Sequence, residues 1–267
     1  MIWNKFENRM VITAELVAET GLRIGAGGQS ADPTASDLPV MKTPDGQPFI
    51  PGSSLRGVLR SHVERIVRAF EALGPGRGAC SPTNTAEWCI KSDDIKRIRE
   101  QLRNEPEKLA QKIFQKSCRV CRVFGSPWLA SRVRIADLPC INGAQAETRD
   151  AVAIDREKET VANKYDFEAV PIGSKFALNI IAENLNELER GLLWLGIEEL
   201  QRGQILLGGF KSRGLGWVKL VNLRIHFVEG REELCNYLRT GEIPPLELEE
   251  AHSWVEKLLH ELAGGEK

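Results

Sequence analysis

Residues 50–57 read Ile-Pro-Gly-Ser-Ser-Leu-Arg-Gly and lead from a glycine- and proline-rich stretch into the first clear helix of the chain. Ser53 or Ser54 can cap that helix by accepting its free backbone N–H groups. Apolar side chains then recur at helical spacing until the Gly-Pro-Gly turn at 74–76 ends the helix. The recurring side chains are Leu55, Leu59, Val63, Ile66, Val67 and Phe70.

The start of this helix is also suited to bind phosphate. Unpaired N–H groups and a partial positive charge at a helix N-terminus attract anions. Ser53 and Ser54 add hydroxyl donors, and Arg56 and Arg60 lie one turn apart on the same face. The alternative is an ordinary capped helix whose arginines are solvated.

Outward from this helix, strands and helices alternate along the chain. The stretch before it, Arg9–Thr20, is rich in β-branched residues and predicts a strand. Further strands are predicted after the helix, followed by a second helix and then two strand-like runs. These later segments are Val133–Ile141, Lys175–Ala182, Asn186–Arg202 and Ile205–Val228. This order is that of an α+β, ferredoxin-like (RRM-like) core, in which two helices cover one face of an antiparallel sheet.

Three further segments lie outside that core. Residues of about 77–124 read as an insertion with a charged helix from about Asp93 to Gln115, interrupted at Pro106. Polar residues between strand-like flanks predict a projecting hairpin at about 145–170. We therefore expect one domain over 1–228, followed by an acidic helical extension over 229–267.

Composition and charge limit the class of protein. With 267 residues and 42% apolar content, the chain can bury the core of one large domain. No apolar stretch approaches the roughly 20 residues that span a bilayer, so we expect a soluble, cytoplasmic protein that does not contact membranes.

The net charge of −1 conceals an uneven distribution, because residues 229–267 carry −6 and the rest carries +5. A run without acids predicts a basic face for phosphate, or else a solvated surface; its cations are Lys116, Arg119, Arg122, Arg132 and Arg134.

Four of the six cysteines have spacings typical of a metal site. Cys118 and Cys121 are separated by two residues, and Cys80 and Cys89 form a looser second pair. Four thiolates would complete a tetrahedral structural zinc site with no open position for water. The alternatives are a thiol redox couple of Cys118 with Cys121, or unliganded cysteines. The two cysteines without a near partner, which we expect to be ordinary small apolar residues, are Cys140 and Cys235.

A glycine-rich stretch at 207–217 reads Leu-Gly-Gly-Phe-Lys-Ser-Arg-Gly-Leu-Gly-Trp. Its glycines allow close backbone approach to a phosphate, and Lys211 and Arg213 supply charge. The same residues also make tight turns. A predicted strand rather than a helix follows, which excludes the Walker and dinucleotide-binding patterns.

The stretches at 50–57 and 208–216 together resemble the paired sequence signature of RAMP-superfamily proteins. The resemblance extends from about Thr20 to Val221 and is to the repeating backbone subunits of type III CRISPR effector complexes, in particular the zinc-containing type III-D/III-E-like kind. It implies an antiviral complex in which each such subunit holds CRISPR guide RNA beside other CRISPR effector subunits. The hairpin at 145–170 would be the thumb that enters between bases. The RNA-binding residues implied are Ser53, Ser54, Arg56, Arg60, Arg156, Lys211 and Arg213.

The resemblance also implies a catalytic residue. Some family members cleave the paired target RNA with an aspartate in the loop after the first strand, and Asp37 in Ser-Asp-Leu-Pro-Val (36–40) matches it. Asp32 is the nearest rival, whereas Asp45 is more simply a turn residue. A carboxylate is a weak base at neutral pH, so we expect Asp37 to act with magnesium or on RNA held in in-line geometry.

Several alternatives to a nuclease remain open. Asp37 can be a turn-capping residue in a non-catalytic RNA-binding scaffold of the same kind of complex. A guide-processing endonuclease would need a histidine base, for which His62 is the candidate. A zinc-stabilised module that binds any single-stranded RNA is the third possibility.

Overall fold

The computed structural model describes residues 4–27 and 36–264. Its main sheet has five antiparallel strands in the order β3-β7-β1-β8-β9. Their bounds are Val133–Ile135 for β3, Lys175–Glu183 for β7, Asn8–Ala18 for β1, Val218–Glu229 for β8 and Pro245–Leu246 for β9. Burial alternates along β1 residue by residue, as expected for a strand with one face on the core. The predicted strands at 9–20 and 175–182 are confirmed.

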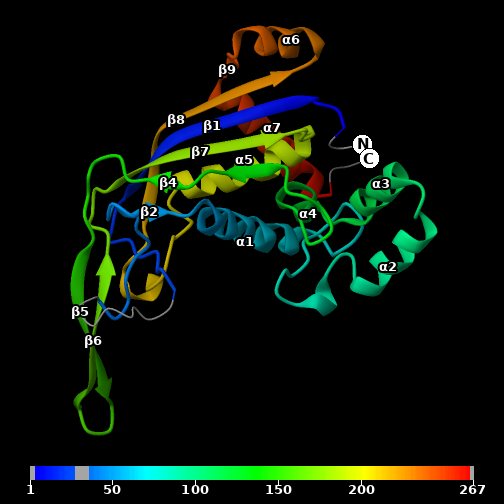
Figure 1. Ribbon diagram of the computed structural model, residues 1–267. Helices are drawn as coiled ribbons and strands as arrows, with labels where there is room; N and C mark the ends of the chain where they lie inside the picture. Colours follow the sequence, from blue (N-terminus) through cyan, green and yellow to red (C-terminus); the bar gives the residue numbers. More distant parts are fainter. Residues whose placement is uncertain (1–3, 28–35, 265–267) are drawn as a thin grey trace.

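Three helices cover that buried face, namely α1 (Gly52–Phe70), α5 (Glu187–Gln201) and α7 (Leu248–Leu262) (Figure 1). Their apolar sides meet the inward side chains of β1 in one continuous core. The helix α7 comes from the acidic C-terminal region and packs in this same core. The short helix α6 (Arg231–Thr240) lies within the predicted acidic helical extension and buries no residue.

The helix α1 begins at Gly52, one residue before the predicted capping serines. The predicted cap is wrong, because no side chain at the N-cap position, Pro51, accepts a bond from the helix. Instead the Gly52 N–H donates to Asp137 Oδ1 at 2.8 Å. A Cβ on residue 52 would lie 2.2 Å from the Ile135 carbonyl oxygen, so only glycine fits. A distant segment therefore caps the helix and leaves Ser53 and Ser54 uncommitted to that role.

That distant segment follows from a short pairing. The strand β2 (Phe49–Ile50) pairs with β4 (Leu138–Pro139), which brings residues 135–139 against the start of α1. Between α1 and β3 lie the 3-10 helix η1 (Thr85–Glu87) and helices α2 (Ser92–Gln101), α3 (Pro106–Lys116) and α4 (Arg119–Phe124). The predicted interruption at Pro106 is confirmed, since proline occupies the first position of α3.

A two-stranded hairpin projects from the body of the molecule (Figure 1). It consists of β5 (Glu147–Asp155) and β6 (Thr160–Ala169). Its outer part exposes an apolar pair, Ile154 at 63% and the opposite Val161 at 61%. A two-stranded ribbon that keeps such side chains in water has little stability of its own, so this surface is suited to contact a partner.

The predicted basic face at 116–134 is wrong for its central arginines. Arg119 is buried against Glu71 at 2.7 Å, and Arg132 is buried against Glu189. Buried guanidinium groups need carboxylate partners because desolvation of an unpaired charge is costly. Arg122 donates to the Phe114 carbonyl oxygen at 3.2 Å. These cations hold the fold together and are not available as a phosphate surface.

Replacing Arg132 by alanine should destabilise the protein by about 3–5 kcal/mol, as expected when one partner of a buried ion pair is lost. The side chain also donates to the Asn184 and Arg122 carbonyl oxygens, at 2.5 and 2.8 Å. Denaturant unfolding would measure the change. Arg134→Ala is the matched control, because Arg134 is 58% exposed in its pair with Glu183 and should cost no more than about 1 kcal/mol. Equal effects of the two variants would contradict the argument.

Candidate metal centre and nucleic-acid interface

The four predicted cysteine ligands meet in one place. Cys80 and Cys89 come from the segment after α1, while Cys118 and Cys121 lie at the first turn of α4. All four Sγ atoms lie within 4.8 Å of one another, with Cys80 and Cys121 at 3.4 Å. Zinc–sulfur bonds of about 2.3 Å place tetrahedral sulfurs about 3.8 Å apart, so the cluster fits such an ion. In the described ranges it is the only such group of three or more ligand side chains.

The electrostatics of the cluster also favour a cation. The neighbouring Cys118 and Cys121 thiols lower the pKa of Cys89 to about 7. Conversely, the pKa of Cys121 is raised, because Cys118, Cys80 and Cys89 lie beside it and burial disfavours a further charge. Four adjacent thiolates therefore repel one another unless a dication lies among them. Without a bound cation, the four cysteines could not all be deprotonated at the same time.

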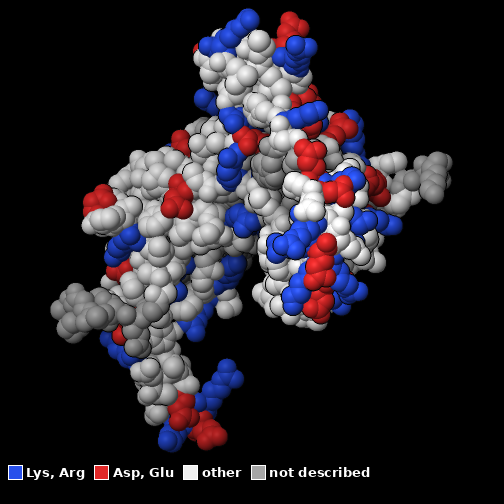
Figure 2. Space-filling model, turned by 45° about the vertical axis from the view of Figure 1, so that its right-hand side comes forward, with Lys and Arg blue, Asp and Glu red and all other residues white. Residues whose placement is uncertain are grey.

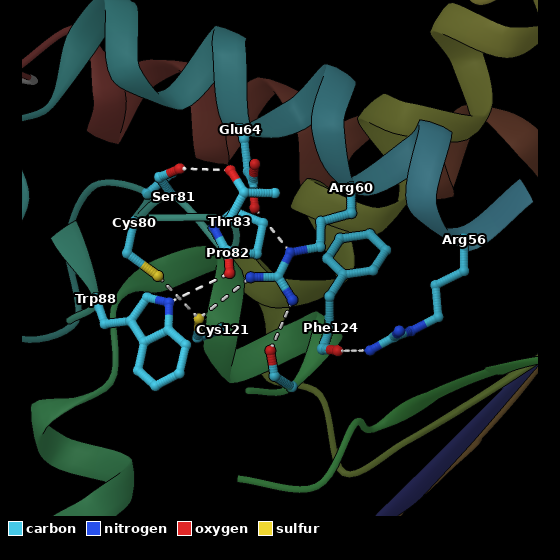
Figure 3. A network of polar contacts seen from close by, with 12 residues as sticks. Arg56, Arg60, Glu64, Cys80, Ser81, Pro82, Thr83, Trp88, Cys121 and Phe124 are labelled. Atoms are coloured by element: carbon cyan, nitrogen blue, oxygen red, sulfur yellow. Dashed lines mark hydrogen bonds and ion pairs between the residues drawn. The ribbon is translucent and has the colours of Figure 1, made fainter. Parts of the chain in front are cut away.

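Arg60 is turned toward this cluster (Figure 3). Its guanidinium donates to Glu64 at 2.7 Å, to the Gly125 carbonyl oxygen at 2.9 Å and to Cys121 Sγ at 3.4 Å. Burial alone would lower the pKa of Arg60, but the Glu64 hydrogen bond raises it above its ordinary value. Arg60 thus places a fixed positive charge beside the sulfurs. Arg56, one turn earlier, donates to the Phe124 carbonyl oxygen.

Asp37 lies in a loop that runs beside the base of the hairpin. Its Oδ2 atom accepts from the Asp166 backbone N–H at 3.1 Å. Asp37 is exposed, and its Oδ1 atom has no hydrogen-bond partner within 4–27 and 36–264. One carboxylate oxygen is therefore held and the other faces outward. The rival Asp32 lies outside the described residues, and Asp45 is in a turn closed by the Gly46 N–H and the Thr43 carbonyl oxygen.

The glycine-rich loop packs against the same hairpin base. Phe210 contacts Phe167 edge to face at 4.9 Å between ring centroids, and Leu38 and Leu215 join them in a small apolar cluster separate from the main core. Arg213 donates to the Tyr165 hydroxyl. The loop after β1, the hairpin and the glycine-rich loop thus share one packing unit.

One glycine of that loop serves the fold itself. Gly208 has φ +75°, and a Cβ there would lie 2.2 Å from the Arg23 carbonyl oxygen. The adjacent Gly209 N–H donates to that oxygen at 2.8 Å. The close approach predicted at 207–217 is therefore to the chain's own backbone. Lys211 and Arg213, in the 3-10 helix η2 (Lys211–Arg213), remain exposed.

A groove between α1 and the segment before the glycine-rich loop gathers further cations. Lys211 lies beside Arg65, and within the described residues neither forms an ion pair with a carboxylate. Burial lowers the pKa of Lys211, and the nearby Arg65 charge lowers it further. An anion in the groove would relieve that repulsion. The remaining lining includes Ser61, His62 and Gln204.

The surface view agrees with a cationic hollow. Figure 2 shows Lys and Arg side chains gathered between the hairpin-bearing side and the lobe that contains α2 and α3. Arg156 lies apart, exposed at the tip of the hairpin. Ser53 is exposed at the start of α1, and Ser54 beside it is half-buried. The predicted RNA-binding residues thus fall in three places, at the helix start, in the glycine-rich loop and at the hairpin tip.

No sequence pattern pointed to Arg65, Gln204 or Asp166 as site residues. Arg65 and Gln204 are separated by more than a hundred residues, and only the packing of α1 beside the 204–211 segment brings them together. The candidate base His62 has both ring nitrogens engaged, with Glu199 at 3.1 Å and Arg65 at 2.9 Å.

In the part of the chain that the structure describes, no helix is long and apolar enough to cross a membrane.

Residues 15–219 match the model of the RAMP superfamily. Three similar proteins are each called CRISPR system Cms endoribonuclease Csm3. The one from Methanothermobacter thermautotrophicus is 26% identical over 88% of this chain and 91% of its own length. The proteins from Mycobacterium tuberculosis and Enterococcus italicus are 25% and 27% identical, over 96% and 86% of this chain and 97% of each relative.

Proposed function

The chain belongs to the RAMP superfamily, and from this premise we propose that it is a guide-RNA-binding backbone subunit of a type III CRISPR effector complex. In this role it would position complementary target RNA and cleave it through Asp37. The similarity to proteins named Csm3 covers most of both chains and so supports an equivalent whole subunit. Its partners would be guide RNA, target RNA and other effector subunits.

One observation carries this proposal: the Asp37 loop, the hairpin base and the cationic glycine-rich loop meet in a single packing unit. Phe167 from β6 contacts Phe210 from the glycine-rich loop, and Leu38 lies in the same cluster. A hairpin that enters between bases would therefore hold its nucleotides close to both an outward carboxylate and exposed cations. This combination is what positioned RNA cleavage requires.

Finer assignments of the fold follow from the same premise. We infer a ferredoxin-like core, since β1, α1, β3, β7, α5 and β8 follow one another in that order and form the sheet order β3-β7-β1-β8. The segment at about 77–124 would be a zinc-binding insertion and the hairpin at 145–170 a thumb. The four-cysteine cluster favours the zinc-containing type III-D/III-E-like kind.

RNA recognition by this subunit would be independent of sequence. Guide–target base pairing reads the sequence, while the protein holds phosphates and shape, a division known from RNA-guided DNA recognition. Lys211, Arg65 and Arg213 would contact guide phosphates beside the helix start at Ser53 and Ser54. Arg56 has one carbonyl partner and keeps further N–H groups for phosphate, whereas Arg60 serves the cysteine cluster.

In the cleavage step, the RNA's own 2′-hydroxyl would lose its proton to water and attack the adjacent phosphorus, and the 5′-oxygen would leave and take up a proton from water. Asp37 has one outward oxygen with which to orient the reacting groups. No set of three ligand side chains lies at Asp37 in the described residues, so magnesium there would need phosphate oxygens as further ligands. Zinc bound by four thiolates would supply only cross-linking, because no coordination position remains open.

Three other functions are weaker. A guide-processing endonuclease would rely on His62, whose ring nitrogens are both engaged. A non-catalytic scaffold of the same complex would use the same cations and differ only at Asp37. A zinc-stabilised module for any single-stranded RNA would bind without regular spacing.

The RNA-binding part is tested by removing the two groove cations together, as Arg65→Ala with Lys211→Ala. We expect guide affinity to fall by about 10–100-fold and the salt slope to decrease by about 1.4, because each lost single-strand phosphate contact removes about 0.7. The loss should be equal for unrelated guide sequences. Filter binding at several salt concentrations would measure the affinity and the salt slope. Nuclease footprints of the assembled complex would show the spacing of the protected sites.

The control is Lys96→Ala with Arg97→Ala, which removes two exposed cations from α2, 74% and 71% exposed. This variant should bind as the unmodified protein does. Equal weakening by both variants would show that the groove cations act only through the overall charge of the protein and not through specific phosphate contacts. Footprints without regular intervals would favour the single-stranded RNA module instead.

A further inference from the structure

Asp166, near the base of β6, contacts the Asp37 loop in both directions. Its Oδ1 atom accepts from the Ser36 hydroxyl at 2.8 Å and from the Asp37 backbone N–H at 2.7 Å. Its own backbone N–H donates to Asp37 Oδ2 at 3.1 Å. The backbone of Asp166 thus orients the Asp37 carboxylate, while the Asp166 side chain holds the Asp37 backbone.

A second acid on the same strand continues this attachment. The Glu168 N–H donates to the Leu38 carbonyl oxygen at 3.1 Å, and Glu168 Oε2 accepts from the Val40 N–H at 3.0 Å. Glu168 Oε1 also pairs with Lys42 at 2.6 Å. Residues 36–42 therefore run along β6, so the loop and the hairpin base form one mechanical unit.

A carboxylate at 166 is a strong acceptor for both donors, because hydrogen bonds to a charged oxygen are stronger than those to a neutral one. Two carboxylates, Asp37 and Asp166, lie close together, and neither forms an ion pair within the described residues. Such like-charge proximity is unfavourable. An asparagine at 166 could accept the same two hydrogen bonds without that repulsion. The two accepted hydrogen bonds, which fix the Asp37 loop, are therefore the feature that position 166 contributes.

We propose that Asp166 is the positioning residue that fixes Asp37 to the hairpin base, so that the cut occurs at one nucleotide relative to the inserted hairpin. The proposal rests on the proposed function, in which Asp37 acts on target RNA. Asp166 would not touch the reacting atoms. It would act by holding Ser36 and Asp37, and small displacements of a catalytic group have large effects on rate.

The test uses the guide-loaded complex and single-turnover cleavage of a complementary target RNA, with target binding measured on the same preparations. Asp166→Ala should slow cleavage by about 10–100-fold and scatter the cut positions, with target affinity unchanged. Asp166→Asn should stay within about threefold of the unmodified rate and keep the cut positions, because its amide oxygen still accepts both bonds. Asp150→Ala is the matched control, since Asp150 lies opposite Asp166 on β5, is 71% exposed and, among the described residues, forms only a surface pair with Lys164.

Ser36→Ala provides a second approach from the other side of the contact. It removes one of the two donors and should slow cleavage by about threefold. Its effect should be smaller when Asp166→Ala is already present, because the two residues share one interaction. Additive effects would overturn the proposal, and so would an Asp166→Asn rate as low as that of Asp166→Ala, since the charge itself would then matter.

Unmodified rates and cut positions in Asp166→Ala would also overturn the proposal, provided that Asp37→Ala abolishes cleavage in parallel. If Asp37→Ala leaves cleavage intact, the catalytic assignment fails instead, and Asp166 has nothing to position. Equal losses of target binding and cleavage in Asp166→Ala would assign Asp166 a purely structural role.

Discussion

Asp37→Ala should abolish cleavage of complementary target RNA by the guide-loaded complex, lowering the single-turnover rate by at least about 100-fold, as expected for loss of an acid–base or orienting group. The physical reason is the outward oxygen of Asp37, which the structure leaves without a partner in the described ranges while the Asp166 N–H holds the other. Target affinity should be unchanged, because one exposed carboxylate contributes nothing to phosphate binding. Gel analysis with and without magnesium would show regularly spaced products only with the intact residue and the metal.

Asp45→Ala is the matched control, because Asp45 is another aspartate of the same loop region and belongs to the turn closed by Thr43 and Gly46. It should leave products unchanged. Asp37→Asn keeps the shape and the hydrogen-bond acceptor but loses the charge, so it should be nearly as slow as alanine. Products that persist in Asp37→Ala would leave this subunit a scaffold, and Asp32→Ala would then be examined as the rival.

Local patterns predicted the helices and strands that bury one regular face. The helix at 52–70 and the strand at 8–18 follow directly from apolar periodicity. The cysteine group was predictable for a similar reason, because the spacing of Cys118 and Cys121 already implies one metal. The helix start was predictable in position but not in its cap, since Asp137 is 85 residues away from Gly52.

Charge was harder to interpret from sequence than apolarity. The acid-free run at 116–134 suggested an exposed basic face, but Arg119 pairs with Glu71 just after α1, and Arg132 pairs with Glu189 in α5. The sequence shows only which charges are neighbours along the chain, whereas in the fold buried charges pair with residues that are far away in the sequence. The groove cation Arg65 was not singled out from the sequence, because only the packing of α1 beside the 204–211 segment places it next to Lys211.

Cys89→Ser should remove bound zinc and lower the melting temperature by about 10 °C. Tight metal binding stabilises the folded state by about 4 kcal/mol at a thousandfold excess over the dissociation constant, and each kcal/mol corresponds to about 2–4 °C for a chain of this size. The effect should be large because the segment between α1 and β3 has only a small core of its own, made of Ile90, Ile95 and Ile113 with a few neighbours. Metal analysis and thermal unfolding would measure both quantities, and a strong chelator should reproduce the variant in the unmodified protein.

Cys140→Ser separates loss of metal from loss of a thiol, because Cys140 is half-buried like Cys89 but lies outside the cluster. It should keep one zinc per chain and an unchanged melting temperature. Cys89→Ser should also retain cleavage wherever the chain remains folded, because a purely structural zinc does not hold the Asp37 loop. A Cys89→Ser protein that keeps its metal would remove Cys89 from the ligand set. A metal-free protein that melts normally would show instead that Arg60 and Glu64, with the small isoleucine core, suffice to hold this segment.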